Sequence, residues 1–263
     1  MKVTVLMENT AVNSQFYAEH GLSLYLETEG HRILFDMGQT EAFADNAEKL
    51  GVDLQKVDFA VLSHGHYDHG GGLKRFLEIN HTAPVYLSRF AFEPHFSGRE
   101  KNIGLDPALQ ENERLHEIGD TYTLAEGIKL YSCNGFARPF ETNSYGLYTM
   151  RDGKLIEEDF RHEQYMVLHE EGRRIVISGC SHKGILNITE WLRPDVLIGG
   201  FHFKKLDPAG AGRQVLEDAA RRLKEYPTVF YTGHCTGTEQ LSFLKKRMGE
   251  QLHGFSAGQV FTV

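Results

Sequence analysis

The sequence predicts an α/β fold in which strands and helices alternate in layers. Four short, nearly continuous apolar runs are typical of strands buried on both faces, and they cover residues 57–63, 173–179, 195–200 and 228–233. Amphipathic helical patterns separate or follow the last three of these runs. No linker, repeat or low-complexity stretch divides the chain, so we expect one domain over residues 1–263.

The composition excludes several classes of partner. The chain has 28 Lys and Arg against 36 Asp and Glu, which gives a formal net charge of −8. Because nucleic acids and anionic membranes attract positive surfaces, neither is an expected partner. No apolar run approaches the ~20 residues of a membrane span, and the start of the chain is too polar for a signal peptide. The odd count of three cysteines speaks against a disulfide framework and predicts a cytoplasmic protein.

The N-terminal part of the chain predicts three strands and a helix. Residues 3–7 and 21–30 have the apolar patterns of strands, and a third strand ends at Asp36. The helix is expected over residues 40–50, with Thr40 as its N-cap and a glycine directly after it.

The C-terminal half predicts three helices. Apolar residues share one helical face over residues 185–192 and again over 216–223. A capping box at Thr236 and Glu239 predicts the start of the last helix, and a glycine ends it. Residues 90–170 are less regular, and we interpret them as an insertion that covers the substrate or joins the subunits of a homo-oligomer.

A histidine follows each of the four apolar runs. The four are His64, His182, His202 and His234, and each run reaches its histidine through Ser or Gly. One such histidine alone would most simply be a hydrogen-bonded structural residue. Four of them at strand ends indicate a ligand site, because strand ends gather at one edge of an α/β structure. Neutral imidazole is also the commonest metal ligand.

The first of these histidines belongs to a dense cluster of ligand-type residues. His64 and His66 are two residues apart, so in extended backbone both side chains point the same way and can hold one ion. Asp68 and His69 follow and can turn toward a second ion, and Asp68 could also orient a catalytic water. Nitrogen and carboxylate ligands suit zinc, iron or manganese. The cluster therefore predicts a site for one or two divalent metal ions.

The HGHYDH string at residues 64–69 resembles the signature of the metallo-β-lactamase superfamily, and Asp36 matches the acidic residue that closes an early strand there. Further strings are similar to the subgroup that contains the archaeal 7,8-dihydropterin-6-methyl-4-(β-D-ribofuranosyl)aminobenzene 5′-phosphate synthase. They are AEHGLS (18–23), RHEQY (161–165), GCSH (179–182), GGFH (199–202) and GHCTG (233–237). The resemblance implies an αββα sandwich with the metal ions at one edge of two packed sheets.

The chain departs from the superfamily pattern at two places. Most members carry a bridging Asp after the strand that matches residues 173–179, where this chain has Gly179, Cys180 and Ser181. The usual third ligand between the first motif and that strand is also missing, so we expect His182 to complete the site. The resemblance and the strand-end positions together imply six metal ligands: His64, His66, Asp68, His69, His182 and His234.

Residues beside the expected ligands are candidates for catalysis and substrate binding. In phosphodiesterase relatives, the strand that His202 ends carries an acid/base histidine, which implies a catalytic role for His202. Lys183, Lys204 and Lys205 follow expected site histidines and predict a rim for an anionic, phosphorylated small molecule. Each lysine alone could equally be a solvated surface residue.

Four other residues have weaker support. The subgroup resemblance alone implies that His20 and His162 line the rim of the substrate pocket. Cys180 and Cys235 each neighbour an expected ligand, and we interpret both as small buried packing residues, although a thiolate is also a good metal ligand.

Three functions remain open at this stage. The first is a metal-dependent hydrolase of a phosphorylated or ester-like small molecule, and the second is a synthase-like transferase that uses a dihydropterin pyrophosphate. The third is an iron-binding redox or sensor protein with the same ligands. Both enzymes would use the ion, because it can lower the pKa of water toward ~7 and stabilise negative charge on a phosphoryl oxygen.

Overall fold

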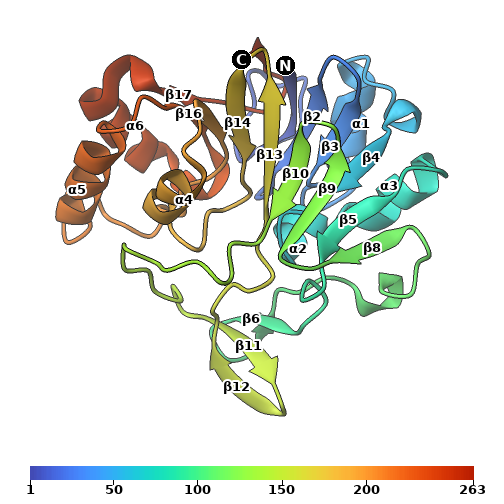
Figure 1. Cartoon of the computed structure of the whole chain (residues 1–263), viewed down its shortest axis with the longest axis horizontal. Coiled ribbons are helices and arrows are strands. Elements are labelled where there is room, and N and C mark those ends of the chain that lie inside the picture. Colours follow the sequence, from blue (N-terminus) through green and yellow to red (C-terminus); the bar gives the residue numbers. More distant parts are fainter.

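The computed structural model describes all 263 residues and contains two seven-stranded β-sheets (Figure 1). The first sheet has the strand order β18-β1-β2-β3-β4-β5-β8. Its strands are β1 (Lys2–Met7), β2 (Ser23–Glu27), β3 (Arg32–Phe35), β4 (Phe59–Val61), β5 (Val85–Ser88), β8 (Leu115–Ile118) and β18 (Val260–Thr262).

The second sheet has the strand order β17-β16-β15-β14-β13-β10-β9, in which β14, β15, β16 and β17 run parallel. Its strands are β9 (Thr121–Ala125), β10 (Ile128–Tyr131), β13 (Tyr165–Glu170), β14 (Arg173–Ile177), β15 (Val196–Ile198), β16 (Val229–Thr232) and β17 (Leu252–Gly254). Both sheets contribute to a core of 21 buried residues, which shows that they pack face to face.

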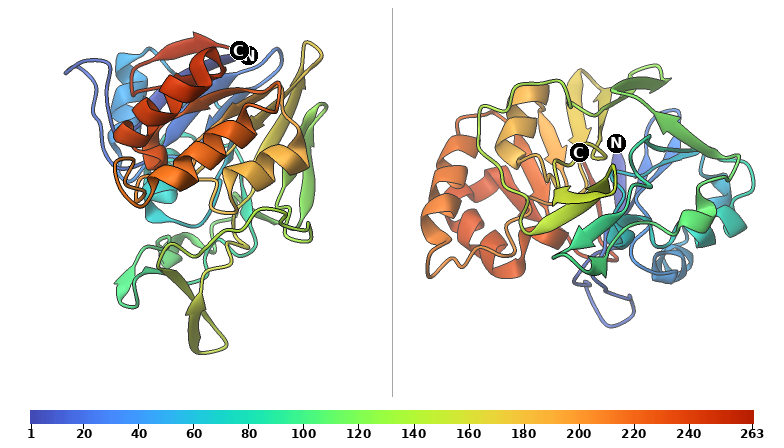
Figure 2. Two further views of the ribbon diagram at one scale, coloured as in Figure 1. Left: turned by 90° about the vertical axis from the view of Figure 1, so that its left-hand side faces the viewer. Right: turned by 90° about the horizontal axis from the view of Figure 1, so that it is seen from below.

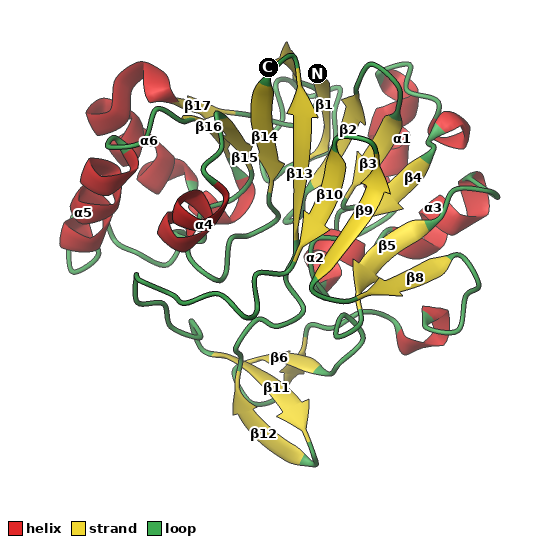
Figure 3. Cartoon of the chain, viewed as in Figure 1, coloured by secondary structure: helices red, strands yellow, loops and turns green.

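Helices cover the outer face of each sheet, which completes the four layers (Figure 2, Figure 3). On the first sheet, α1 and α3 form a core of 16 buried residues, and on the second sheet α4, α5 and α6 form a core of 18. The helices are α1 (Ala42–Lys49), α2 (Tyr67–Gly70), α3 (Leu73–Ile79), α4 (Ile185–Leu192), α5 (Arg213–Leu223) and α6 (Thr238–Met248). Short 3₁₀ turns are η1 (Leu54–Lys56), η2 (Pro107–Leu109), η3 (His234–Thr236) and η4 (Gly249–Gln251). None of the helices is long and apolar enough to cross a membrane.

A third, four-stranded sheet lies below the sandwich in Figure 1, with the strand order β12-β11-β6-β7. Two separate parts of the chain form it. Its strands are β6 (His95–Ser97), β7 (Lys101–Asn102), β11 (Leu147–Arg151) and β12 (Lys154–Glu157). We call this unit the small sheet.

The structure confirms the αββα sandwich and corrects two local expectations. Residues 90–170 are not one insertion, because β8 joins the first sheet while β9, β10 and β13 join the second. The capping box is wrong, since α6 begins after Gly237 with no side-chain cap. The Thr236 hydroxyl instead accepts the Phe201 N–H at 2.9 Å and lies 2.5 Å from the Thr232 hydroxyl. The Thr236 hydroxyl is therefore engaged in tertiary hydrogen bonds and does not cap α6.

Candidate metal centre

The predicted histidines gather at the edge of the sandwich that faces the small sheet. They follow the ends of strands β4, β14, β15 and β16, and a cavity of about 470 Å³ opens beside them. Three strand-end residues of this edge, Asp36, His202 and His234, have the left-handed backbone, with φ of 58°, 57° and 52°. This conformation is uncommon outside glycine, and strain of this kind is concentrated at functional sites.

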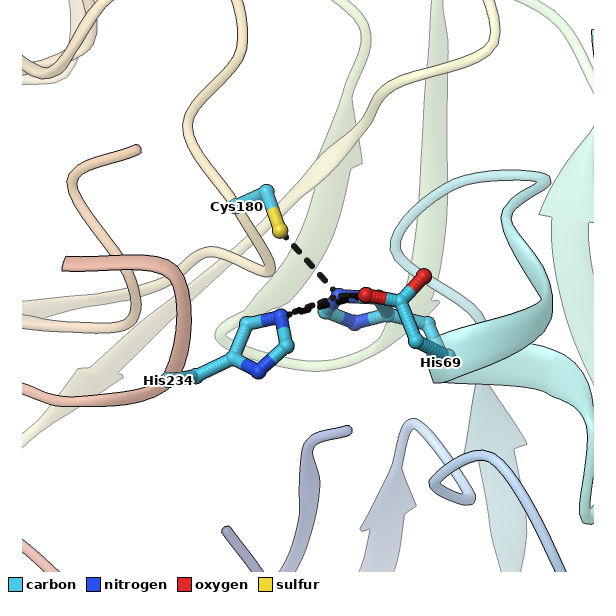
Figure 4. Close-up of side chains that lie close together, drawn as sticks. His69, Cys180 and His234 are labelled. Carbon is cyan, nitrogen blue, oxygen red and sulfur yellow. Dashed lines mark hydrogen bonds and ion pairs between the residues drawn. The ribbon is translucent and has the colours of Figure 1, made fainter. Parts of the chain in front are cut away.

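One group of four side chains has the spacing of a metal site. The Nε2 atom of His69 lies 3.1 Å from His234 Nε2 and 3.2 Å from Cys180 Sγ. Asp68 Oδ2 lies 3.4 Å from His234 Nε2 and 3.7 Å from His69 Nε2. Metal bonds of about 2.0–2.3 Å in a tetrahedron place ligand atoms roughly 3.3–3.8 Å apart, which is close to these distances. Figure 4 shows His69, Cys180 and His234 pointing toward one another from α2 and from the loops after β14 and β16.

A second group combines His64, His66 and His182, whose ring nitrogens lie within 4.8 Å of one another. All three side chains are buried, and the Nε2 atom of each makes no hydrogen bond. Buried polar atoms without a partner are rare in folded proteins because they carry the full cost of desolvation. A divalent ion would satisfy all three nitrogens, so these residues fit a metal.

Cys180 is a ligand-type residue that the sequence interpretation favoured as packing, with metal ligation as the alternative. It lies in the loop after β14, where the resemblance implies a bridging Asp in most superfamily members, and its thiol lies 3.2 Å from His69 Nε2 in the first group. In the sequence, its position two residues before His182 was the feature that could have indicated a metal ligand. A cysteine replaces a carboxylate here, so this group keeps four ligand-type side chains; burial, helped by Cys235, raises the pKa of the thiol well above its ordinary value, so a bound metal would have to displace its proton.

Asp36 determines which ring nitrogens face the two groups. Its buried carboxylate accepts hydrogen bonds from His69 Nδ1 and from the Ser63 hydroxyl, both at 2.7 Å. The Ser63 hydroxyl in turn accepts a bond from His64 Nδ1 at 2.8 Å. With Nδ1 held as the hydrogen-bond donor, Nε2 is the nitrogen of both histidines that faces a ligand group, as in carboxylate–histidine–metal chains.

His234 is oriented from the loop after β1. Its Nδ1 donates to Asn9 Oδ1 at 2.9 Å, which again leaves Nε2 as the free nitrogen. Its backbone N–H donates to the Glu8 carboxylate at 2.5 Å. Neither Glu8 nor Asn9 has a sequence signal, because their role depends on a contact between the two ends of the chain.

A third group of histidines lies behind His66. Here His95 and His162 stack at 3.9 Å, and His95 Nδ1 donates to the buried Glu158 carboxylate at 2.7 Å. The Nδ1 atom of His162 accepts the Gly65 N–H at 2.8 Å, so the neutral ring carries its proton on Nε2 and offers no lone pair there. His162 therefore supports the backbone of the HGHYDH motif, and it is buried away from the pocket rim where the sequence interpretation expected it.

The structure brings most of the expected substrate residues together. His20, His202, Lys204 and Lys205 all line the cavity. The sequence analysis missed the residues that the small sheet and the position directly after β7 contribute to the same cavity, because nothing in the pattern predicts how that sheet packs. They are Ser97, Lys101, Ile103 and Leu147.

Lys183 does not lie in the cavity, and its expected place on the substrate rim is wrong. It is fully buried, and its ammonium donates to the backbone carbonyls of Ser132 at 2.6 Å and Glu163 at 2.9 Å. The Glu163 carboxylate in turn accepts the N–H groups of His182 and Lys183. This pair connects the loop before β13 to the loop that carries His182. Burial lowers the pKa of Lys183 to about 8.

The surroundings shift the pKa values of the site histidines in different directions. Burial lowers the pKa of His64, His66 and His182 well below the ordinary value, so these rings are neutral and free to act as ligands. Burial opposes the charged form of His69 as well, but the carboxylates of Asp36 and Asp68 outweigh it and raise its pKa. Burial, helped by His234, lowers the pKa of His202 to about 3.

Comparisons with known proteins identify the family of the chain. The family model of the metallo-beta-lactamase superfamily matches residues 17–234. The chain is 30% identical over 270 residues to "Uncharacterized protein MJ0448" of Methanocaldococcus jannaschii, covering 98% of this chain and 97% of that protein. It is 27% identical over 287 residues to the 7,8-dihydropterin-6-methyl-4-(beta-D-ribofuranosyl)-aminobenzene-5'-phosphate synthase of the same organism, covering 99% and 96%.

Solved structures show the same fold. The crystal structure of Tm1679, described as a metal-dependent hydrolase of the beta-lactamase superfamily, superposes with a TM-score of 0.85 at 27% identity, covering 100% of this chain and 99% of that one. The metallo-beta-lactamase fold protein YhfI from Bacillus subtilis superposes with a TM-score of 0.59 at 15% identity, covering 99% of each chain.

Replacing Asp36 should weaken metal binding without direct loss of a ligand. In Asp36→Asn the side chain keeps one acceptor oxygen for three donors, the Ser63 N–H, the Ser63 hydroxyl and His69 Nδ1, so the rings of His64 and His69 lose their fixed tautomers. We expect zinc affinity to fall about 10- to 100-fold, measured by competition with a chromogenic chelator. Asp58→Asn, at an exposed carboxylate before β4, should bind zinc like the wild type. Equal affinity in both variants would contradict the role of Asp36.

Replacing Lys183 should reduce stability. Lys183→Met leaves the carbonyls of Ser132 and Glu163 without a donor, which we expect to cost about 1–3 kcal/mol in urea unfolding. Lys204→Met removes an exposed lysine that lines the cavity and should leave the unfolding midpoint unchanged. A wild-type midpoint for Lys183→Met would show that its buried hydrogen bonds contribute nothing.

Proposed function

The chain belongs to the metallo-beta-lactamase superfamily, and from this premise we propose that it is a metal-dependent hydrolase of a small phosphorylated molecule. One observation carries the proposal: both ligand groups contribute residues to a single cavity whose other charged side chains are lysines. A cavity of about 470 Å³ suits a small molecule. Ammonium groups favour an anionic one.

The two groups divide the ligands between two positions. Asp68, His69, Cys180 and His234 would hold one ion, while His64, His66 and His182 would hold the other. A bound zinc, iron or manganese ion would supply Lewis-acid stabilisation of charge that develops on a phosphoryl oxygen. Because His182 and Cys180 also line the cavity, substrate would reach both positions.

Other side chains would orient the substrate and handle protons. His202 lies 4.3 Å from His182 between ring centroids, and its buried Nδ1 has no hydrogen-bond partner. Since its ring is neutral and lines the cavity, a ring nitrogen of His202 could accept a proton or a hydrogen bond from the reacting group. His20 stacks on His234 at 4.8 Å and lies 3.3 Å from Asp68 Oδ2, so it would fix the Asp68 carboxylate. Lys204 and Lys205 would bind the phosphoryl charge.

A synthase-like transfer is the second candidate. The observation in its favour is the 27% identity to the dihydropterin synthase over nearly the full length of both chains. In this reaction the same lysines would hold the leaving pyrophosphate of a dihydropterin substrate. Both reactions place negative charge on oxygen at the same site, so they need the same ligands.

A substrate panel on metal-analysed protein tests the proposal. We expect protein purified without added metal to contain zinc, iron or manganese, and the loaded protein to hydrolyse phosphodiesters or phosphate esters. Turnover only of a dihydropterin pyrophosphate with a ribosyl-aminobenzene phosphate would support the synthase instead. No turnover, together with an iron-dependent visible band that changes on reduction, would overturn both in favour of a redox or sensor protein.

His66→Ala should abolish tight metal binding at the second ligand group, and activity with it, while the domain stays folded and the first group keeps its four ligands. His66 supplies one nitrogen of the second ligand group, whereas the three large cores of the sandwich form without it. Metal content by elemental analysis and circular dichroism check the two parts. His81→Ala, at an exposed histidine before β5, serves as the matched control. An unfolded His66→Ala protein would instead show that metal binding and folding are coupled.

A further inference from the structure

We propose that Lys101 is a specificity-determining residue that binds a second anionic group of the substrate at the wall formed by the small sheet. This inference rests on the proposed function, because it concerns the same cavity and a phosphorylated substrate. It assigns a role to a part of the chain that carries none of the expected ligands or substrate residues. Three observations support the proposal: the pairing of β6 with β7, the single carboxylate that lines the cavity, and the Tyr67 ring near Lys101.

Strand pairing aims Lys101 into the cavity together with Ser97. Strands β6 and β7 are antiparallel, and their register pairs Ser97 directly with Lys101. Directly paired residues project from the same face of a sheet. Both residues line the cavity, so this face of the small sheet forms one of its walls and presents an ammonium beside a hydroxyl.

The Lys101 ammonium has no charge partner within the protein. No Asp or Glu oxygen lies within 4 Å of its Nζ, unlike Lys2 and Lys56, which pair with neighbouring carboxylates. The one carboxylate that lines the cavity belongs to Asp68. Its Oδ2 atom is already surrounded by the imidazoles of His20, His69 and His234.

The cavity therefore concentrates positive charge in an acidic chain. Three lysines line it against the single carboxylate, although the formal net charge of the protein is −8. Lys204 and Lys205 come from the loop after β15, and the Lys205 ammonium donates to the Tyr145 carbonyl at 2.7 Å. Lys101 comes from the small sheet instead, so two separate structural units supply cations. A substrate with a single anionic group at the metal ions would not need lysines from both units.

An aromatic and aliphatic surface adjoins Lys101. Its Nζ lies 5.7 Å from the centroid of the Tyr67 ring, and Tyr67 stands between His66 and Asp68 in the HGHYDH motif. Ile103 and Leu147 line the cavity beside this ring and belong to the same buried cluster. A substrate that fits has an apolar or aromatic body, a phosphoryl group at the metal ions and a second oxyanion at Lys101.

Binding of two non-hydrolysable probes to the zinc-loaded full-length protein tests this assignment. Phenylphosphonate carries one anionic group, and 4-carboxyphenylphosphonate adds a carboxylate at the far end of the ring. We expect calorimetry to give about 3- to 10-fold tighter binding of the carboxylated probe to the wild type, as for a cation that remains partly solvated. In Lys101→Ala the two affinities should become equal, and Lys101→Arg should restore the difference.

Lys154→Ala is the matched control, because Lys154 is an exposed lysine of β12 in the same small sheet but does not line the cavity. It should keep the wild-type preference, and all variants should keep the wild-type zinc content. A preference retained in Lys101→Ala would overturn the assignment of Lys101, and so would a wild type that binds both probes equally. A wild type that binds neither probe would overturn the proposed phosphorylated substrate as well.

Discussion

The buried carboxylate of Asp36 is the constraint on which the rest of the site depends. It lies directly after β3 and accepts hydrogen bonds from the Ser63 N–H and hydroxyl and from His69 Nδ1, each at 2.7 Å. Through Ser63 it also orients His64, so one side chain organises a histidine of each ligand group. A buried carboxylate is tolerated only when it is fully hydrogen-bonded. The strands that carry Asp36 and Ser63 are therefore held in register by the same bonds that prepare the ligands.

The close approach of the two sheets at this edge imposes a second requirement. A Cβ atom on Gly179 would lie 2.2 Å from the Ser63 hydroxyl, which is far inside van der Waals contact. The glycine after β14 is thus what allows the loop of Cys180 and His182 to approach the loop of His64. The cores on either side of the sheets fix the strands, and the strand ends then bring the two ligand groups together without long flexible segments.

The predictable part of the site is the part that follows from strand ends. The HGHYDH motif and the histidines after β14, β15 and β16 are visible in sequence because each is local to one strand. Lys183 could not be assigned, because its burial results from packing against Ser132 and Glu163, which are far away in sequence. Lys101 was missed for a similar reason, since its place in the cavity depends on how the small sheet packs against the edge of the sandwich. The predicted cap of α6 was wrong because the Thr236 hydroxyl accepts a hydrogen bond from the distant Phe201 N–H instead.

Because the ligands lie on loops and the hydrophobic cores on sheets and helices, metal binding would stabilise mainly the loops. The unpartnered nitrogens of His64, His66 and His182 carry a desolvation cost of roughly 1–3 kcal/mol each when no ion satisfies them. This cost is small beside the hydrophobic stabilisation of the sandwich. Its three main clusters bury 21, 18 and 16 hydrophobic residues, and none of these residues is a proposed metal ligand. Coordination would thus act on the loops, by removing the unsatisfied nitrogens and fixing the rings of His66 and His182 beside the cavity. Because the large cores form apart from the ligands, the sandwich can hold the ligands aligned and open to substrate on one side.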